Sequence, residues 1–211
     1  HTATAAPAAS DAAPKGCVAT NEYGLYAGER YLAAGGVIDI REGEERLFNP
    51  LPLFYVNSLL ITTMTMVLSG GCCIYPDRFH ATTWWADIRA SRATMFQYLG
   101  IVLPALHALP VTEDERNHQV RIAVGAGADP TMHAAFEERF RIPIVEVWGM
   151  TEVAIASIAC RKPRDVGSRS IGHPCAGMEF RVVDDEDRPL PVGETGELVV
   201  RRSGGDPQRG L

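Results

Sequence analysis

Residues 120–152 read VRIAVGAGADPTMHAAFEERFRIPIVEVWGMTE, and this stretch decides the fold. It opens with a compact β-rich run, passes through a loop with two glycines, and reaches the apolar run 142–148. Between the two runs, Asp129 is a residue type favoured at the N-cap of a helix, and Pro130 fits the first helical position. The stretch therefore predicts a strand, a glycine-bearing loop, a helix and a second strand.

The same alternation of helices and strands runs through the chain before residue 120. Helices are expected at residues 18–36, 53–71, 81–92 and 101–110, and extended segments at 46–54, 70–75 and 93–100. Elements that alternate in this way form a parallel sheet with helices on its faces. Residues 178–202 differ, because two apolar runs flank a polar turn rich in proline and glycine, which indicates an antiparallel pair.

The sequence thus predicts an α/β fold: a mostly parallel sheet with flanking helices plus a small C-terminal antiparallel β subdomain. We expect residues 1–13 to be a linker or disordered arm, residues 14–169 to form the α/β subdomain, and residues 170–211 to begin the small β subdomain. Residues 1–13 contain neither the basic nor the apolar region of a signal peptide.

Composition argues against several classes of protein. Of the 211 residues, 46% are hydrophobic and 22% are charged, as in ordinary globular domains. The net charge of −6 argues against a nucleic-acid partner. No segment reaches the roughly 18 consecutive apolar residues of a membrane-spanning helix. The five cysteines form no CxxC pair, which argues against a zinc site and a disulfide framework. We expect a cytoplasmic protein with reduced thiols.

The glycine loop at residues 125–128 is the first candidate ligand site. In open α/β sheets, ligands bind at the carboxyl ends of strands, where glycines let the backbone approach a phosphate or a planar ligand. Many α/β proteins place such glycines after a strand only to turn tightly. Both interpretations remain open for this loop when it is considered alone.

The strand end VWGMTE, residues 147–152, is the second candidate site. Trp148 offers a ring face to a purine, and Gly149 removes a side chain that would block close approach. Thr151 offers a hydroxyl to a phosphate oxygen, and Glu152 offers carboxylate oxygens of the kind magnesium selects. The alternative is a plain strand terminus with a core tryptophan and a solvated glutamate.

The order of the motifs resembles that of the adenylate-forming superfamily, which includes acyl-CoA synthetases, luciferases and peptide synthetase adenylation domains. The motifs are GAGADP (125–130), VWGMTE, and SIGHPCAGMEFRVVDDEDRPLPVGETGELVVRR (170–202). The resemblance runs from about Pro14 to the C-terminus and indicates a fragment of the N-terminal domain. The general look is closest to bacterial acyl-CoA ligases such as crotonobetaine/carnitine CoA ligase.

The resemblance implies an ATP-dependent, AMP-forming carboxylate–CoA ligase that uses ATP, Mg and coenzyme A. A small carboxylic acid would be activated as acyl-AMP and then transferred to coenzyme A. The family often forms dimers, so a homodimer is a candidate oligomeric state. Two alternatives stay open: an adenylation module that loads a carrier protein, and a catalytically inactive nucleotide-binding relative.

The resemblance also implies roles for individual residues. Thr151, Glu152 and Lys15 would be catalytic, and Glu152 would hold magnesium. Phe54 and Tyr55 would line the substrate pocket, although many relatives carry a histidine where this chain has Tyr55. The implied cofactor-binding residues are Gly125, Ala126, Gly127, Ala128, Trp148, Gly149 and Met150.

The phosphate loop departs from the family pattern. Relatives carry a loop rich in Ser, Thr and Gly that ends in Pro-Lys-Gly, and here Pro14, Lys15 and Gly16 survive after a stretch without glycine. Such a stretch cannot wrap backbone N–H groups around pyrophosphate in the same way. Either the loop is lost, or residues before Pro14 are missing from this sequence.

Two further groups of polar residues are interpreted as surface features. We expect His80, His107, His118 and His133 to lie at the surface, because none has a partner at metal-ligand spacing. The sequence Glu137-Glu138-Arg139 indicates a solvated helix face.

Family members continue into a mobile C-terminal domain with a catalytic lysine, and a further subdomain precedes the phosphate loop. Neither is recognisable in these 211 residues. We therefore expect the isolated polypeptide to be inactive in adenylation, with ATP–pyrophosphate exchange at the background rate. Exchange above background would contradict this expectation.

Overall fold

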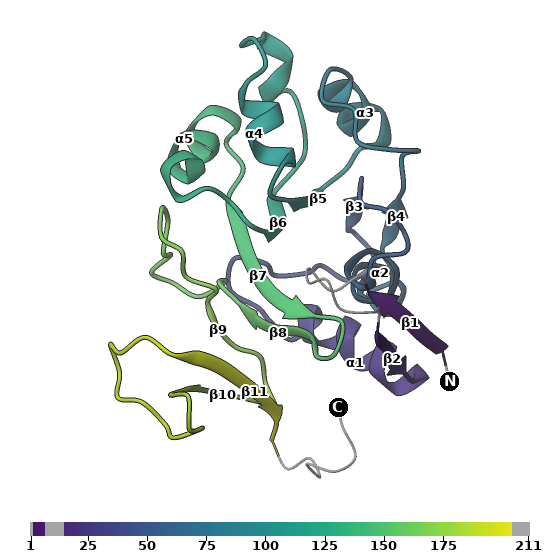
Figure 1. Ribbon diagram of the computed structural model, residues 1–211. Coiled ribbons are helices and arrows are strands. Elements are labelled where there is room, and N and C mark those ends of the chain that lie inside the picture. The colour runs from purple at the N-terminus through teal and green to yellow at the C-terminus, as the bar shows by residue number, and fades with distance from the viewer. Residues whose placement is uncertain (1, 7–14, 204–211) are drawn as a thin grey trace.

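The computed structural model describes residues 2–6 and 15–203, and its centre is a seven-stranded sheet (Figure 1). The strand order is β4-β3-β5-β6-β7-β8-β9. The first five strands in this order are parallel to one another, and β8 and β9 continue the sheet antiparallel. The bounds are β3 (Arg46–Phe48), β4 (Cys72–Ile74), β5 (Met95–Leu99), β6 (Ile122–Ala126), β7 (Ile144–Met150), β8 (Ala154–Ile158) and β9 (His173–Pro174).

Helices cover both faces of this sheet. Figure 1 shows α3, α4 and α5 together on one side of the strands, with α1 and α2 on the other. The helices are α1 (Asn21–Leu32), α2 (Thr63–Leu68), α3 (Trp84–Ser91), α4 (Val102–His107) and α5 (Pro130–Phe140), with the π-helix η1 (Asn57–Thr62) and the 3-10 helix η2 (Glu113–Arg116).

Successive side chains of the strands point to opposite faces of the sheet and pack against the helices on each face. Phe96 on β5 and Ile144 on β7 pack towards α3, α4 and α5. Their neighbours Met95 and Val145 belong to the cluster with α1 and α2. Successive side chains of a strand point to opposite faces, so a sheet buried on both sides needs apolar residues at every position. The apolar runs in the sequence reflect this double burial.

The sheet has a switch point between β3 and β5. The chain passes from β3 outward to β4 and then returns to the other side of β3 as β5. In open α/β sheets, ligands bind outside the carboxyl ends of the strands at such a point. The segments that follow β3, β4, β5, β6 and β7 all leave from this one edge, because the strands are parallel.

The antiparallel pair predicted near the C-terminus is confirmed. Strands β10 (Met178–Val183) and β11 (Glu197–Arg202) pair in antiparallel register and lie apart from the main sheet in Figure 1. A small core of Val153, Ala156 and Met178 packs them against β8, and Trp148 and Phe180 cover it. The predicted α/β fold class is likewise confirmed, including the helix that begins after the N-cap Asp129.

Three elements differ from the sequence prediction. Within the segment expected to be a linker, β1 (Thr2–Ala6) pairs with β2 (Lys15–Ala19), and residues 7–14, where the phosphate-loop prediction falls, lie outside the described part. Helix α1 begins later than expected, because Thr20 caps it by accepting a hydrogen bond from the Tyr23 amide (3.1 Å). Strand β8 was not anticipated.

All five cysteines lie within the described part, and all are free thiols. No helix in that part is long and apolar enough to cross a membrane.

The predicted solvated face on α5 is wrong, because Glu137 is the centre of a polar cluster. Its carboxylate accepts hydrogen bonds from Arg164 (2.5 and 2.8 Å), the amide of Ile144 (2.7 Å) and His133 (3.0 Å). His133 is buried, which corrects the expectation of a surface histidine, and its Nδ1 accepts from the amide of Gly167. These contacts fix the segment after β8 against α5.

The pKa of Glu137 makes this cluster sensitive to acid. Burial alone would raise that pKa, but hydrogen bonds from Arg164, His133 and Ile144 lower it from 4.5 to about 2. At 1.36 kcal/mol per pKa unit this is at most about 3 kcal/mol, and solvent screening reduces it to about 1–2 kcal/mol. Because the folded pKa is depressed, the contribution is present above pH 4.5 and is lost as the pH falls towards 2.

We predict that Glu137→Gln flattens the acid limb of the stability profile. The difference in free energy of unfolding between the wild type and this variant should shrink by about 1–2 kcal/mol between pH 5 and pH 2.5. Urea unfolding across that pH range measures it. Glu138→Gln, which changes the exposed neighbouring carboxylate, is the matched control and should keep the wild-type slope. Parallel profiles for wild type and Glu137→Gln would contradict the prediction.

Candidate active site

The glycine loop after β6 is shaped by close packing against the end of β5. Gly125 is buried, and a Cβ there would overlap the backbone and ring of Tyr98. Gly127 is exposed, has φ +81°, and abuts Gly100 of the neighbouring loop. Both glycines are therefore needed for the fold, whereas the loop itself is half-buried at Ala126 and Ala128 and exposed at Gly127.

Glu146 on β7 holds this loop in place, and the sequence analysis did not single it out. Its carboxylate accepts hydrogen bonds from the amides of Gly127 (2.9 Å) and Ala128 (2.8 Å), and from the hydroxyl of Tyr98. Burial, followed by the charge of Glu146, raises the pKa of Tyr98 well above its ordinary value, so Tyr98 keeps its proton and donates. The register that places Gly125 opposite Glu146 makes this arrangement possible.

Trp148 lies two residues beyond Glu146 and so on the same face of β7. Its ring is half-buried and meets Phe180 edge-on, with ring centroids 5.8 Å apart and an interplanar angle of 77°. The indole thus packs against the β10–β11 hairpin. The role of Trp148 in binding a nucleotide stays a prediction.

Gly149 is required by the return of β8 onto β7. A Cβ at this position would overlap the carbonyl of Ala154, and the strand register shifts between Trp148 and Gly149. Ala154 itself has φ +57°, a left-handed conformation that costs a non-glycine residue about 1–2 kcal/mol. Close approach by β8 therefore explains the glycine that the sequence analysis attributed to a ligand.

Residues 151–153 form the turn between β7 and β8 and present Thr151 and Glu152. Glu152 is exposed, whereas Thr151 is half-buried and its carbonyl accepts a hydrogen bond from the Tyr23 hydroxyl (2.7 Å). Burial, and then the charge of Glu152 and a hydrogen bond to it, raise the pKa of Cys17. Glu152 therefore lies beside β2, the strand that also contains Lys15.

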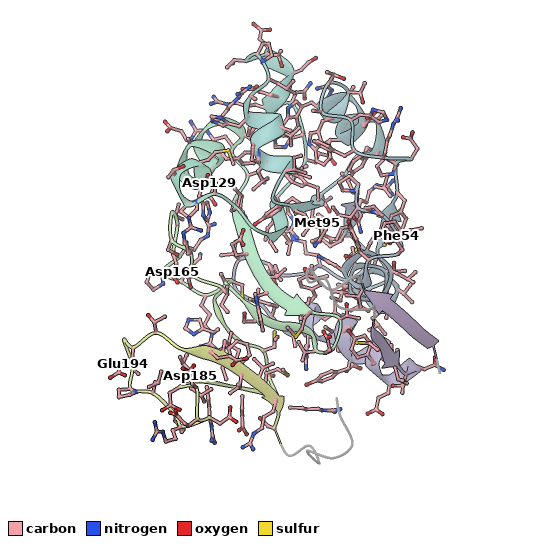
Figure 2. The ribbon with its side chains drawn as sticks, in the orientation of Figure 1. Phe54, Met95, Asp129, Asp165, Asp185 and Glu194 are labelled. Atoms are coloured by element: carbon pink, nitrogen blue, oxygen red, sulfur yellow. The ribbon has the colours of Figure 1, made fainter. Side chains whose placement is uncertain are left out.

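The two candidate substrate-pocket residues, Phe54 and Tyr55, lie in the segment that follows β3. Phe54 is 74% exposed and packs edge-on against Tyr55, with ring centroids 4.8 Å apart. Figure 2 shows Phe54 on the opposite side of the molecule from Asp129, the residue that caps α5 after the glycine loop. The structure thus separates Phe54 from the glycine loop.

Tyr55 lines a cleft of about 590 Å³ at the switch point of the sheet. The segments after β3 and β4 and the end of β5 form its walls. Leu99, in the wall, pairs with Ala126, so the cleft and the glycine loop are on adjacent strands. The lining is mainly apolar and aromatic: Pro50, Leu51, Pro52, Leu53, Tyr55, Tyr75, Pro76, Asp77, Arg78, Phe79, Leu99, Ile101 and Val102.

The chemistry of the turn fits magnesium held together with a nucleotide. Within the described part of the chain, no group of three or more His, Cys, Asp or Glu side chains converges on one point. Magnesium is usually bound through one or two carboxylates plus substrate phosphates and does not need such a cage. One exposed carboxylate, that of Glu152, is consistent with this mode of binding.

Comparison with known proteins agrees with these features. The sequence pattern described as "AMP-binding enzyme" matches residues 10–205, which is most of the chain. The chain belongs to the AMP-binding enzyme family. The glycine loop, the β7–β8 turn and the β10–β11 hairpin all fall within the matched residues.

Two curated relatives and one solved structure illustrate the similarity. A sulfoacetate–CoA ligase of Cupriavidus necator is 31% identical over 89% of the chain, and a crotonobetaine/carnitine–CoA ligase of Salmonella typhi is 26% identical over 89%. The chain spans 36% of the length of each. O-succinylbenzoate coenzyme A synthetase of Bacillus subtilis, solved with AMP, shares the fold with a TM-score of 0.78 at 19% identity, covering 95% of this chain and 50% of that one.

Proposed function

We propose that this chain is the nucleotide-binding part of an ATP-dependent, AMP-forming acyl-CoA ligase. The observation that carries the proposal is the position of Glu152: an exposed carboxylate at the carboxyl edge of the sheet, beside the strand with Lys15, in a member of the AMP-binding family. The two curated relatives are named as CoA ligases, which supports coenzyme A as the acceptor.

The proposed reaction has two steps. A carboxylate oxygen of the acid attacks the α-phosphorus of ATP, and the bond to the β-phosphate oxygen breaks, which gives acyl-AMP and pyrophosphate. The thiolate of coenzyme A then attacks the acyl carbon, and AMP leaves with the electron pair of the broken C–O bond. Both steps build negative charge on oxygen, so positioned donors and cations lower their barriers.

The residues around the glycine loop would hold the nucleotide. The half-buried Trp148 would present part of its ring to adenine, next to the backbone of Gly127 and Ala128 that Glu146 fixes. Gly125, Ala126, Gly149 and Met150 would shape the adjoining surface, with Met150 45% exposed. A loop that is already held in place loses little entropy when a planar ligand binds.

The turn after β7 would meet the phosphates. Thr151 would donate its hydroxyl to a phosphate oxygen, and Glu152 would hold magnesium, which neutralises phosphate charge when it is bound. Lys15 would add a cation from β2. Glu152 lies beside Cys17 of β2, the strand that contains Lys15.

The acid would bind in the cleft beside Tyr55. Apolar and aromatic side chains dominate its walls, and its volume of about 590 Å³ is within the usual range for small-molecule sites. Asp77 and Arg78 are charged but strongly exposed and adjacent to each other. These walls favour an acid with an apolar body, such as an aromatic acid, over an anion as polar as sulfoacetate.

We predict that Glu152→Gln greatly reduces adenylation. In the longest natural polypeptide that contains residues 1–211, the ATP–pyrophosphate exchange rate should fall about 100-fold or more, since loss of the carboxylate weakens magnesium binding where charge develops. Glu194→Gln is the matched control, because this exposed carboxylate lies on the loop between β10 and β11, far from the turn (Figure 2).

Three outcomes separate the candidate functions. Loss of exchange in Glu152→Gln but not in Glu194→Gln supports the proposal. In the wild type, addition of coenzyme A together with ATP and the acid should then release AMP. AMP release only with a carrier protein would instead favour the adenylation module. Nucleotide binding without exchange in the wild type would favour the inactive relative.

We also predict a preference for acids with an apolar body. The kcat/KM for an aromatic acid should exceed that for sulfoacetate by about tenfold or more, and Tyr55→Ser should remove most of this preference without changing the KM for ATP. Val111→Ser, which alters an exposed apolar residue outside the cleft, is the control. Equal kcat/KM values for both acids would contradict the assignment of the cleft.

A further inference from the structure

Helix α1 contacts the turn that carries Glu152 through two side chains on one of its faces. The hydroxyl of Tyr23 donates to the carbonyl of Thr151 at 2.7 Å. Seven residues later, Arg30 donates from one nitrogen to the carbonyl of Val153 (2.9 Å) and to that of Ile155. Positions 23 and 30 are two helical turns apart and therefore face the same way. Alternate carbonyls of residues 151–155 are thus held by one helix.

The environment of Arg30 is unusual for a charged residue. Arg30 is 5% exposed, and its guanidinium also contacts Met178 Sδ at 2.9 Å and lies 3.9 Å from the ring centroid of Tyr26. None of its hydrogen bonds within the described residues is to a carboxylate. Burial of a guanidinium without a paired anion costs free energy, and the hydrogen bonds of Arg30 to these carbonyls offset part of that cost. Apolar packing alone therefore does not account for Arg30, whereas its bonds to the turn do.

The turn itself needs such support. Ala154 holds a left-handed backbone conformation, and Gly149 has no room for a side chain. Strained conformations of this kind persist only where surrounding contacts over-determine them. Tyr23 and Arg30 supply contacts on both sides of the strained residue. Burial raises the pKa of Tyr23 to about 12, so its hydroxyl keeps the proton that it donates.

We propose that Tyr23 and Arg30 are positioning residues, which fix the β7–β8 turn so that Glu152 stays beside β2. The inference rests on the proposed function of Glu152. Helix α1 follows β2 after a single residue, Thr20, so the same rigid element joins the end of the phosphate-loop motif to the turn. A shift of α1 would move β2 and the β7–β8 turn together and so preserve the distance between them.

The test compares Tyr23→Phe with Tyr26→Phe in the longest natural polypeptide that contains residues 1–211. Both variants remove one hydroxyl from α1, but among the described residues that of Tyr26 donates only to the carbonyl of Ala176, at 3.4 Å. Tyr23→Phe should raise the free Mg²⁺ concentration for half-maximal pyrophosphate exchange about three- to tenfold, with a Tm close to that of Tyr26→Phe.

A second readout does not depend on activity. Affinity for Mn²⁺ in the presence of ATP, measured by electron paramagnetic resonance, should fall about three- to tenfold in Tyr23→Phe and stay unchanged in Tyr26→Phe. The amides of residues 151–154 should also exchange with deuterium faster in Tyr23→Phe. At position 30, Arg30→Met should weaken Mn²⁺ binding more than Arg30→Lys, because lysine retains a donor for one carbonyl.

The outcomes distinguish this inference from the proposed function. If Glu152→Gln weakens Mn²⁺ binding while Tyr23→Phe and Arg30→Met match Tyr26→Phe, the positioning role is wrong and the function stands. A fall in Tm for Tyr23→Phe without any change in Mn²⁺ affinity would likewise overturn the inference, since it would show a purely structural role. If Glu152→Gln leaves Mn²⁺ affinity unchanged, the proposed function itself fails.

Discussion

The fold of β8 back onto β7 is the constraint on which the candidate site depends. It is possible only because position 149 carries no side chain, and it forces Ala154 into a left-handed conformation. The short turn between these strands leaves Thr151 and Glu152 at the carboxyl edge of the sheet. The same return strand packs against the β10–β11 hairpin, so the small β unit is attached through the element that shapes the site.

Several buried and half-buried charged side chains in this protein form hydrogen bonds to backbone amides or carbonyls of loops and turns. Glu146 accepts from two loop amides, Glu137 accepts from the amide of Ile144, and Arg30 donates to two carbonyls of the turn. Backbone groups that leave regular structure need partners when they are buried, and a charged side chain forms stronger hydrogen bonds to them than a neutral one. Irregular loops are thereby held firmly at the sheet edge where ligands of α/β proteins bind.

The glycine loop and the apolar cleft are two neighbouring parts of this edge. Leu99 and Ala126 are paired on adjacent strands, and each begins the segment that forms one of the two surfaces. The two surfaces are about one strand spacing apart, near 4.8 Å. A single ligand with a planar polar part and an apolar part could therefore contact both. An acyl-adenylate, the intermediate of the proposed reaction, combines these two parts in one molecule.

The sequence by itself determined the α/β alternation, the start of α5 and the C-terminal hairpin, because these depend on local signals. Asp129, for example, accepts from the amide of Thr131 only two residues away (2.8 Å). Tertiary structure alone decided the burial of His133 and Glu137, the role of Glu146 and the contacts of α1. The partners Tyr23 and Thr151 are 128 residues apart, and Arg30 and Val153 are 123 apart. No periodicity or motif encodes such pairs, since they form only when packing of the sheet brings distant backbone groups beside a side chain that can satisfy them.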